Sequence, residues 1–287
     1  MKNKYNICVA GAGKWGLNHV RTLQSLNALG GVVELNKDII ETIKIKYPKC
    51  KIFSNLDDTF NEDFDGYVIA TPPATHFDLA MKVISNKKPV LVEKPITLDY
   101  NSSVKLSEYA RKMNVNLMVG HILLFHPAFQ KMKELIDDGL IGEIQYIYSN
   151  RLNLGTFRTN ENVFWSFAPH DIALFNYFFK KKPESIFSKG VDILQENIQD
   201  STITSFKYEG NKMGHIFVSW LHPFKEHRFI IIGSNDHTNI LKKIFRKNIK
   251  KFKNLEYYEI KKNDVYFHKN KIKEIKNIKK VKIDKKY

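Results

Sequence analysis

The sequence predicts an α/β domain at the start of the chain, followed by a second part in which strands dominate. From Lys4 to Gly120, short apolar runs alternate with amphipathic segments, which is typical of βαβ units around a parallel sheet. After residue 140 the pattern changes to strands linked by short turns. With 287 residues, of which 43% are hydrophobic, the chain is long enough for two domains.

The predicted strands of the first part are brief, rich in Val and Ile, and bounded by Gly, Pro or charged residues. They lie at residues 5–10, 30–35, 50–53, 66–70, 89–93 and 115–120. Helical patterns separate them at residues 18–26, 37–47, 75–86 and 99–113. Strands connected by helices in this way form a parallel sheet that is buried on both faces.

The second part is predicted to hold five strands and a single helix. The strands lie at residues 143–155, 185–194, 201–210, 212–221 and 227–233. The helix covers about residues 169–180, between the first two of these strands. Short turns between successive strands favour antiparallel pairing.

A glycine-rich motif, "GAGKWG", follows the first strand directly and opens a helix. Gly11 permits a tight turn, Gly13 lets the backbone approach a diphosphate, and Gly16 allows close packing of the helix on the strand. Backbone N–H groups at the start of the helix then face the diphosphate. The loop, with Lys14 and Trp15 between its last two glycines, is therefore predicted to bind a dinucleotide.

The choice between NAD and NADP depends on Glu34, at the end of the second predicted strand. A carboxylate there accepts hydrogen bonds from the adenosine ribose and repels a 2′-phosphate. The sequence therefore predicts NAD. The competing interpretation is a surface glutamate without a ligand.

Two further strand ends carry polar residues at the edge where open parallel sheets bind ligands. "ATPPATH" places Thr71 and Pro72 after the fourth strand and His76 at the start of the next helix. "VEKPIT" places Glu93 and Lys94 after the fifth strand. All five are predicted to line the dinucleotide site.

At these motifs the chain resembles the Gfo/Idh/MocA family (glucose–fructose oxidoreductase, inositol dehydrogenase and relatives). "GAGKWG", "ATPPATH", "VEKPIT" and "GHILLFHPAFQKMKELIDDGLIGEI" occur in the family's order, and the resemblance covers roughly residues 5–240. It implies a Rossmann NAD-binding domain at 1–120 and a substrate and oligomerisation domain with an open antiparallel sheet at 121–241. A lysine-rich segment at 242–287 follows.

The resemblance also implies catalytic residues. The lysine of the family's Glu-Lys-Pro motif contacts the nicotinamide ribose and the substrate hydroxyl, which corresponds to Lys94. The family's acid/base histidine corresponds to His170, which follows Pro169 in the first turn of a predicted helix, where a neutral imidazole is favoured. Many members have an aspartate four residues earlier, where this chain has Ser166. Asp171 is expected to act locally, as an acid in the first turn of the helix.

The stretches around His170 and "VSWLHPFKEHRFIIIG" resemble the branch that oxidises C3 of UDP-N-acetylglucosamine-derived uronates, on the route to bacterial surface polysaccharides. Such a substrate carries a diphosphate and a carboxylate, which arginine binds well. The expected substrate-binding residues, besides His170, are Arg151, Asn153, Arg158 and Trp165, the last of which also has a packing interpretation. Lys225 and Arg228 are further candidate cations.

Two other functions stay open. One is an NAD(P)-dependent dehydrogenase of a free sugar or polyol. The other is a non-catalytic dinucleotide-binding protein with a nucleic-acid-binding tail. Family members usually continue beyond the point where this chain ends, so a shortened enzyme, a partner-dependent enzyme and a decayed gene product are all compatible with the sequence.

The net charge of +16 belongs mostly to one segment. Residues 241–287 carry 18 Lys and Arg against 5 Asp and Glu, and the rest of the chain carries 28 against 25. We interpret this segment as a solvated end rather than a nucleic-acid arm.

The two cysteines lack metal-ligand spacing, so no metal site is predicted. No apolar stretch reaches the length of a membrane span, and the expected location is the cytoplasm. A homo-oligomer formed through the second-domain sheet is expected, together with a nucleotide-sugar substrate.

Overall fold

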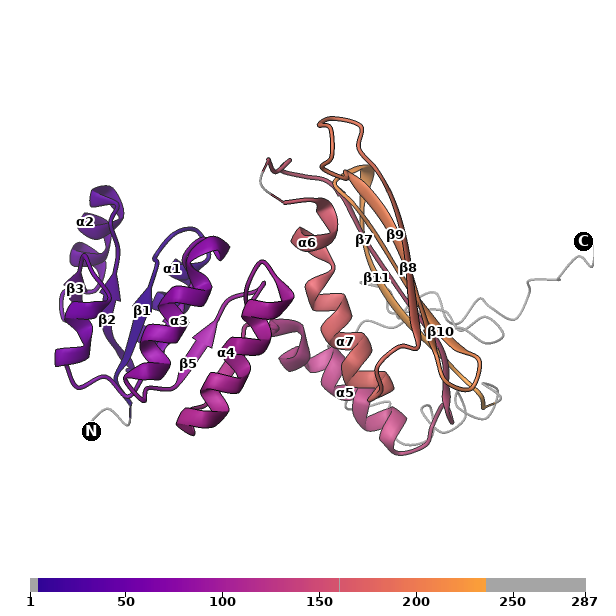
Figure 1. Ribbon diagram of the computed structural model, residues 1–287, viewed down its shortest axis with the longest axis horizontal. Coiled ribbons are helices and arrows are strands. Elements are labelled where there is room, and N and C mark those ends of the chain that lie inside the picture. Colours follow the sequence, from indigo (N-terminus) through magenta and orange to yellow (C-terminus); the bar gives the residue numbers. More distant parts are fainter. Residues whose placement is uncertain (1–4, 160, 236–287) are drawn as a thin grey trace, which may run out of the picture. The chain divides into compact units, whose positions relative to one another are not determined.

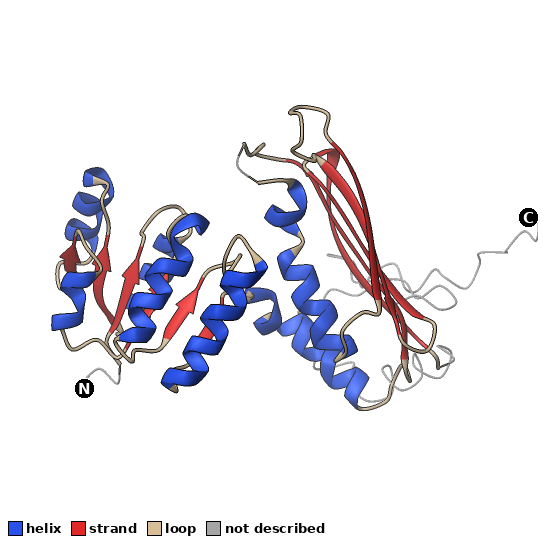
Figure 2. Ribbon diagram, in the orientation of Figure 1, coloured by secondary structure: helices blue, strands red, loops and turns tan. Residues whose placement is uncertain are grey.

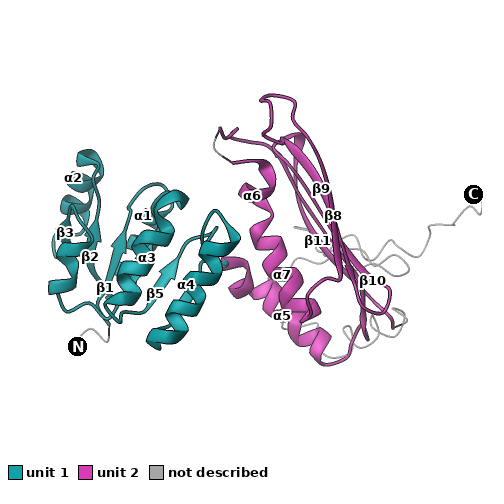
Figure 3. Cartoon of the chain, viewed as in Figure 1, with its two compact units in different colours: residues 1–121 teal, residues 122–287 magenta. Residues whose placement is uncertain are grey.

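The computed structural model describes residues 5–159 and 161–235. The chain divides into two compact units, Met1–His121 and Ile122–Tyr287 (Figure 3). The predicted lysine-rich segment at 242–287 lies outside the described residues.

Unit 1 contains a six-stranded parallel sheet with the order β3-β2-β1-β4-β5-β6; Figure 1 labels β1, β2, β3 and β5 of this sheet. Its strands are β1 (Ile7–Ala10), β2 (Leu29–Val33), β3 (Lys51–Phe53), β4 (Gly66–Ile69), β5 (Val90–Val92) and β6 (Leu117–Val119). The strand order reverses between β1 and β4, and dinucleotides bind outside the carboxyl ends of the strands at such a switch point. This arrangement is the predicted Rossmann architecture.

Four α-helices connect these strands. They are α1 (Gly16–Ser25), α2 (Lys37–Lys46), α3 (His76–Ser85) and α4 (Tyr100–Met113). Val20 of α1 and Ile43 of α2 pack with Val9 of β1 in one cluster, and Ala80 of α3 and Leu106 of α4 pack in another. The strands are therefore covered on both faces, which explains their continuous apolar runs.

Local sequence explains where several helices begin and end. Asn36 caps α2 by accepting hydrogen bonds from the N–H groups of Asp38 and Ile39, at 2.9 and 3.2 Å. Asp99 caps α4 in the same way, and Asn114 ends it in the left-handed conformation at φ 54°. These caps satisfy backbone groups that the helix itself leaves unpaired.

Unit 2 contains a five-stranded sheet with helices on one face (Figure 2). Its strands are β7 (Ile144–Leu154), β8 (Ser185–Val191), β9 (Ser201–Tyr208), β10 (Lys212–Ser219) and β11 (Leu221–Gly233), in the order β11-β7-β10-β9-β8. Its α-helices are α5 (Pro127–Asp137), α6 (Val163–Phe167) and α7 (Pro169–Phe179). The predicted single helix is thus α7, preceded by the short α6.

The sheet of unit 2 is mixed, which corrects one detail of the predicted antiparallel sheet. β10 pairs with β7 in parallel, whereas the other neighbouring strands pair antiparallel. A parallel pair requires a crossover between the two strands. Here the chain leaves β7 and returns only after α7, β8 and β9.

The core of unit 2 lies between α7 and one face of its sheet. Leu174 and Phe175 of α7 are at most 1% exposed and pack with Ile147 of β7 and Ile216 of β10. A Cβ atom at Gly214 would lie 2.6 Å from the ring of Phe175, so the helix comes close to the backbone of β10. Residues that flank Gly214 therefore point to the opposite face.

Candidate functional site

The turn after β1 needs two of its three glycines for steric reasons. Gly11 has φ +86°, and a Cβ atom there would lie 2.8 Å from the backbone nitrogen of Thr71. A Cβ atom on Gly16 would lie 2.0 Å from the carbonyl oxygen of Gly11. The turn thus crosses close to the end of β4, and α1 starts directly against it.

Gly13 has a different role, because a Cβ atom there would meet nothing within 4 Å. Within the described part of the chain, the structure shows no hydrogen bond from the backbone N–H groups of Gly13, Lys14 or Trp15. Three donors at the start of a helix, next to open space, fit a diphosphate. The geometry therefore fits the dinucleotide that the sequence predicts.

Glu34 lies just after β2 and faces this loop. Its Oε2 accepts a hydrogen bond from the N–H of Ala12 at 2.8 Å, and its Oε1 accepts from Leu35 and Asn36 at 2.8 and 3.0 Å. A carboxylate has about four acceptor positions, so about one is left for a ribose hydroxyl. Glu34 both holds the loop and fits the ribose-binding position.

The ends of β4 and β5 are joined through His76. This residue is 1% exposed, and its two ring nitrogens lie 2.8 Å from the carbonyl oxygens of Thr71 and Pro95. Thr71 is further held by its hydroxyl, 2.7 Å from the hydroxyl of Thr75, while Pro72 is exposed. His76 therefore positions both strand ends and directs neither nitrogen towards open space.

Glu93 is a buried acid whose carboxylate accepts three hydrogen bonds. It is 7% exposed, and its Oε1 accepts hydrogen bonds from Trp15 Nε1 at 2.7 Å and His19 Nε2 at 2.8 Å. Its Oε2 accepts from the N–H of Lys94 at 3.2 Å. Burial favours a higher pKa for Glu93, but these hydrogen bonds and the charge of His19 leave its pKa below the usual value.

Lys94 and His121 lie beside this acid. Lys94 is half-buried, and its peptide bond to Pro95 is cis. The pKa of His121 is lowered, mainly by burial and also by the charge of Lys94, against the opposing effect of Glu93. His121 comes just after β6, so the strand-end rule that identified Lys94 also points to it.

Neither His121 nor His19 is among the predicted site residues. His19 carries no such signal in the sequence, because its contact with Glu93 spans 74 positions.

In unit 2, His170 and Asp171 occupy the first turn of α7. Asp171 is 1% exposed and accepts hydrogen bonds from Arg151 Nε and Nη2 at 2.9 and 3.0 Å, and from Ser149 Oγ at 2.7 Å. The predicted local role of Asp171 was therefore incomplete, since this pair also ties the first turn of α7 to β7. Ser166, four residues before His170, is buried in α6.

Only two of the predicted substrate-binding residues, Arg151 and Asn153, lie on the same strand face. Arg151 and Asn153 share one face of β7, and Asn153 Oδ1 is a buried acceptor without a partner among the described residues. Arg158 lies in the loop beyond β7 and pairs with Glu161 at 3.0 Å, and Trp165 is 43% exposed.

The two further candidate cations do not join this group. Arg228 is opposite Asn150 in the ladder and so lies on the other face of the sheet. Lys225 is exposed in the irregular first part of β11.

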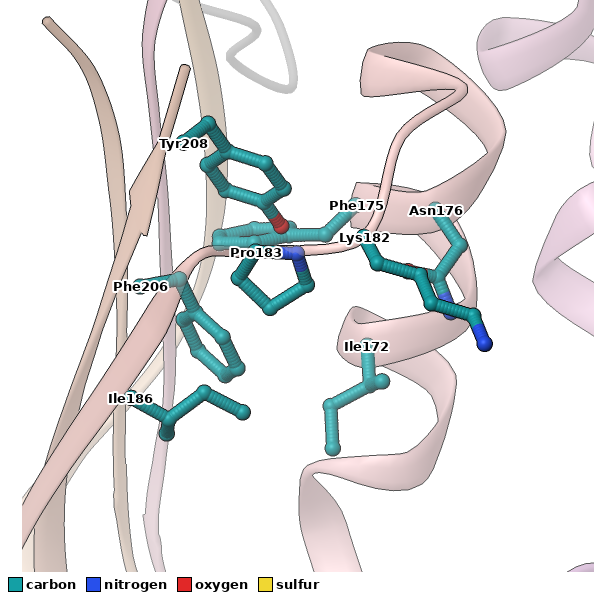
Figure 4. Close-up of a pocket in the computed structure, with 8 residues that line it drawn as sticks. All are labelled: Ile172, Phe175, Asn176, Lys182, Pro183, Ile186, Phe206 and Tyr208. Carbon is teal, nitrogen blue, oxygen red and sulfur yellow. The ribbon is translucent and has the colours of Figure 1, made fainter.

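A hollow of about 360 Å³ lies in unit 2 between α7 and the strands β8 and β9 (Figure 4). It is lined by Ile172, Phe175, Asn176, Lys182, Pro183, Ile186, Phe206 and Tyr208. No predicted site residue lines it. Its lining is mostly apolar, with Asn176, Lys182 and Tyr208 as the polar members.

The described residues, 5–159 and 161–235, contain no group of three or more His, Cys, Asp or Glu side chains suited to a metal ion. None of the helices in these ranges combines the length and apolar composition needed to cross a membrane. Cys8 and Cys50 are free thiols, and burial raises the pKa of Cys50 to about 11.

The fold and the glycine-rich site are those of a dinucleotide-binding protein, and comparison with family models identifies the family. Residues 5–121 match the NAD-binding Rossmann fold of the oxidoreductase family Gfo/Idh/MocA, and residues 129–237 match the C-terminal domain of the same family. The chain belongs to this family, and unit 1 is its NAD-binding domain.

Similar proteins include dehydrogenases of polyols and of a nucleotide sugar. An inositol 2-dehydrogenase from Mycolicibacterium smegmatis is 34% identical over 143 residues, which are 48% of this chain and 41% of that protein. The structure of scyllo-inositol dehydrogenase from Lactobacillus casei has a TM-score of 0.74 at 20% identity and covers 81% of this chain and 74% of that one.

UDP-N-acetylglucosamine 3-dehydrogenase from Acidithiobacillus ferrooxidans has a TM-score of 0.73 at 24% identity, covering 81% of this chain and 72% of that one. At these identities the structural likeness shows the fold. The match to the inositol 2-dehydrogenase spans less than half of that relative's length.

Proposed function

We propose that the protein is an NAD-dependent dehydrogenase that oxidises a secondary alcohol of a sugar or polyol to a ketone. The observation that carries this proposal is the arrangement of unit 1. The backbone N–H groups of Gly13, Lys14 and Trp15 lie after the carboxyl end of β1. The half-buried Lys94 lies after the carboxyl end of β5 in the same parallel sheet. Family membership supports the same reaction class.

In the proposed reaction, NAD⁺ supplies the acceptor for the hydride that leaves the alcohol carbon. Lys94 donates a hydrogen bond to the alcohol oxygen, and the neutral imidazole of His170 takes the hydroxyl proton. The alcohol loses one hydride to NAD⁺ and one proton to His170 and becomes a ketone, so the two-electron oxidation of the alcohol equals the two-electron reduction of NAD⁺. Arg151 and Ser149 hold Asp171 and thereby fix the first turn that carries His170.

We propose a UDP-N-acetylglucosamine-derived uronate, oxidised at C3, as the substrate. Support comes from the resemblance of the segment around His170 and from a structural relative named as a UDP-N-acetylglucosamine 3-dehydrogenase. Asn153, whose Oδ1 lacks a partner among the described residues, offers an acceptor for a sugar hydroxyl.

A free polyol is the second candidate, since two of the similar proteins are named as inositol dehydrogenases. The two candidates differ in charge, because the nucleotide sugar carries a diphosphate and a carboxylate whereas inositol carries neither. NADH formation with UDP-N-acetylglucosaminuronate or with myo-inositol, measured by absorbance, separates them. Turnover of the uronate alone supports the first substrate, and turnover of inositol alone replaces it by the second.

We also propose that the protein forms a homo-oligomer through the face of the unit 2 sheet that lies opposite α7. This outer face carries exposed apolar side chains on three neighbouring strands: Phe187, Val191, Ile203 and Met213. A second copy of the chain would remove them from water, which is favourable. The pairing would be symmetric, as in most homodimers.

A further inference from the structure

The carboxylate of Glu93 connects three segments of unit 1 that are far apart in the sequence. Glu93 follows β5. Its carboxylate accepts hydrogen bonds from Trp15, in the loop after β1, and from His19, in α1. It also packs against the end of β6. At that last point a Cβ atom on Gly120 would lie 2.9 Å from the Glu93 carboxyl carbon. The carboxylate is therefore fixed from all of these sides.

The indole of Trp15 reaches across the carboxyl edge of the sheet. β1 and β5 are separated by β4 in the strand order, so the bond from Trp15 Nε1 to Glu93 spans the end of β4. Only one edge of the ring is held, since Trp15 remains 46% exposed. The ring is thus held in a defined position beside the backbone donors of the glycine-rich loop.

His19 supports this arrangement from the first turn of α1. Its side chain is 20% exposed, and its Nε2 donates to the same oxygen, Glu93 Oε1, that accepts from Trp15. A buried acid without enough donors would be driven towards its neutral form, and a neutral carboxyl group accepts more weakly. His19 therefore keeps Glu93 in the ionised form that holds the indole.

We propose that His19 and Glu93 are positioning residues for NAD(H), which hold Trp15 and the glycine-rich loop in the conformation that receives the dinucleotide. A loop that is ordered before binding loses less conformational entropy when the ligand arrives. The pair therefore acts on the affinity for NAD(H) and has no part in proton transfer. This inference rests on the NAD site of the proposed function but not on the identity of the sugar.

The test compares three variants of the full chain in a fluorescence titration with NADH. His19→Phe keeps the ring size but cannot donate to Glu93. Loss of one charge-assisted hydrogen bond predicts an affinity for NADH that is about tenfold weaker. His19→Gln restores a donor and is expected to bind like the wild type. Arg21→Gln, on the exposed side of the same helix, is the control and should change nothing.

A second readout follows the indole N–H groups by ¹H–¹⁵N NMR spectroscopy. The chain has three tryptophans, and the indole of Trp220 is also bonded to a carboxylate, that of Asp200 in unit 2. We expect the Trp15 resonance, assigned with Trp15→Phe, to shift in His19→Phe and to return in His19→Gln. The Trp220 resonance should stay in place and show that the variants are folded.

Several results would overturn the proposal. They are unchanged NADH affinity in His19→Phe, absence of rescue by Gln, or unchanged affinity with a lower turnover number at saturating NAD⁺. If His19→Phe does not fold, Trp15→Phe removes the Trp15–Glu93 bond, which His19 is proposed to support, from an exposed position. Wild-type affinity of that variant would also contradict the proposal. NADH binding without turnover of any sugar would refute the proposed substrates and leave this inference intact.

Discussion

Asp171 and Arg151 show how a single ion pair supports the candidate catalytic turn. Asp171→Asn removes the charge that compensates Arg151, whose side chain is only 19% exposed. Breaking a buried pair from one side costs about 3 kcal/mol in the free energy of unfolding. Urea denaturation of wild type and variant measures this difference.

The pair Lys181–Glu209 is the matched control, since both side chains are more than 60% exposed. Glu209→Gln should leave the unfolding midpoint almost unchanged, because solvent screens exposed pairs. Equal effects of the two substitutions would show that the bond between Asp171 and Arg151 does not anchor α7.

Glu93 predicts a specific dependence of stability on pH. Its pKa is lower in the folded protein than in the unfolded chain, so the ionised carboxylate stabilises the fold at pH values above the unfolded pKa. This contribution is lost as the pH falls through the lower, folded pKa. We expect Glu93→Gln to be less stable than the wild type at pH 7.

The difference between Glu93→Gln and the wild type should shrink as the pH falls from the usual glutamate value, about 4.5, through the lower pKa of the folded protein. Urea unfolding at a series of pH values measures it. A difference in unfolding free energy that stays constant down to pH 3 would argue against an ionised, hydrogen-bonded Glu93.

At the scale of elements, two glycines in the turn between β1 and α1 are expected to have different roles: Gly16 in the stability of the fold and Gly13 in the binding of NADH. Gly16→Ala places a methyl group 2.0 Å from the Gly11 carbonyl oxygen, so the helix must move and the protein loses stability. Gly13→Ala meets no protein atom within 4 Å, so it should fold normally. Its methyl group would occupy the approach of the diphosphate, and NADH affinity should fall at least about tenfold.

Thermal unfolding and NADH titration of both variants test this assignment. Wild-type NADH affinity in Gly13→Ala, with an unchanged melting temperature, would show that the diphosphate does not bind at this loop.

The sequence was most informative where chemistry depends on local order along the chain. The glycine spacing, the strand ends before Thr71 and Glu93, and Pro169 at the start of α7 are short-range patterns, and each predicted element is present. The bonds from Trp15 and His19 to Glu93 could not be predicted, because they join positions more than 70 residues apart. The pairing of β7 with β10 could not be predicted either, because the alternation of apolar and polar residues in a strand does not show which strand pairs with it.

For the whole molecule, the outer face of the unit 2 sheet predicts self-association. Ile203→Glu places a charge in the middle of the exposed apolar residues and should convert an oligomer to a monomer. Light scattering coupled to gel filtration gives the mass of each variant. Ile45→Glu, at a 79% exposed position on α2, is the control and should keep the wild-type mass.

A wild-type protein of monomeric mass would contradict this proposal. So would an oligomer that persists in Ile203→Glu.

The central claim is that Lys94 and His170 act together in an NAD-dependent oxidation. The most direct measurement is NADH formation from NAD⁺ and UDP-N-acetylglucosaminuronate by the wild type, Lys94→Ala and His170→Ala, with a reagent that traps the ketone product and so draws the reaction forward. NADH binding of each variant is measured in parallel. We predict turnover by the wild type and at least about a hundredfold loss in each variant, with His170→Ala still binding NADH. Turnover that survives either substitution, or a wild type that binds NADH but oxidises neither the uronate nor myo-inositol, would contradict the account.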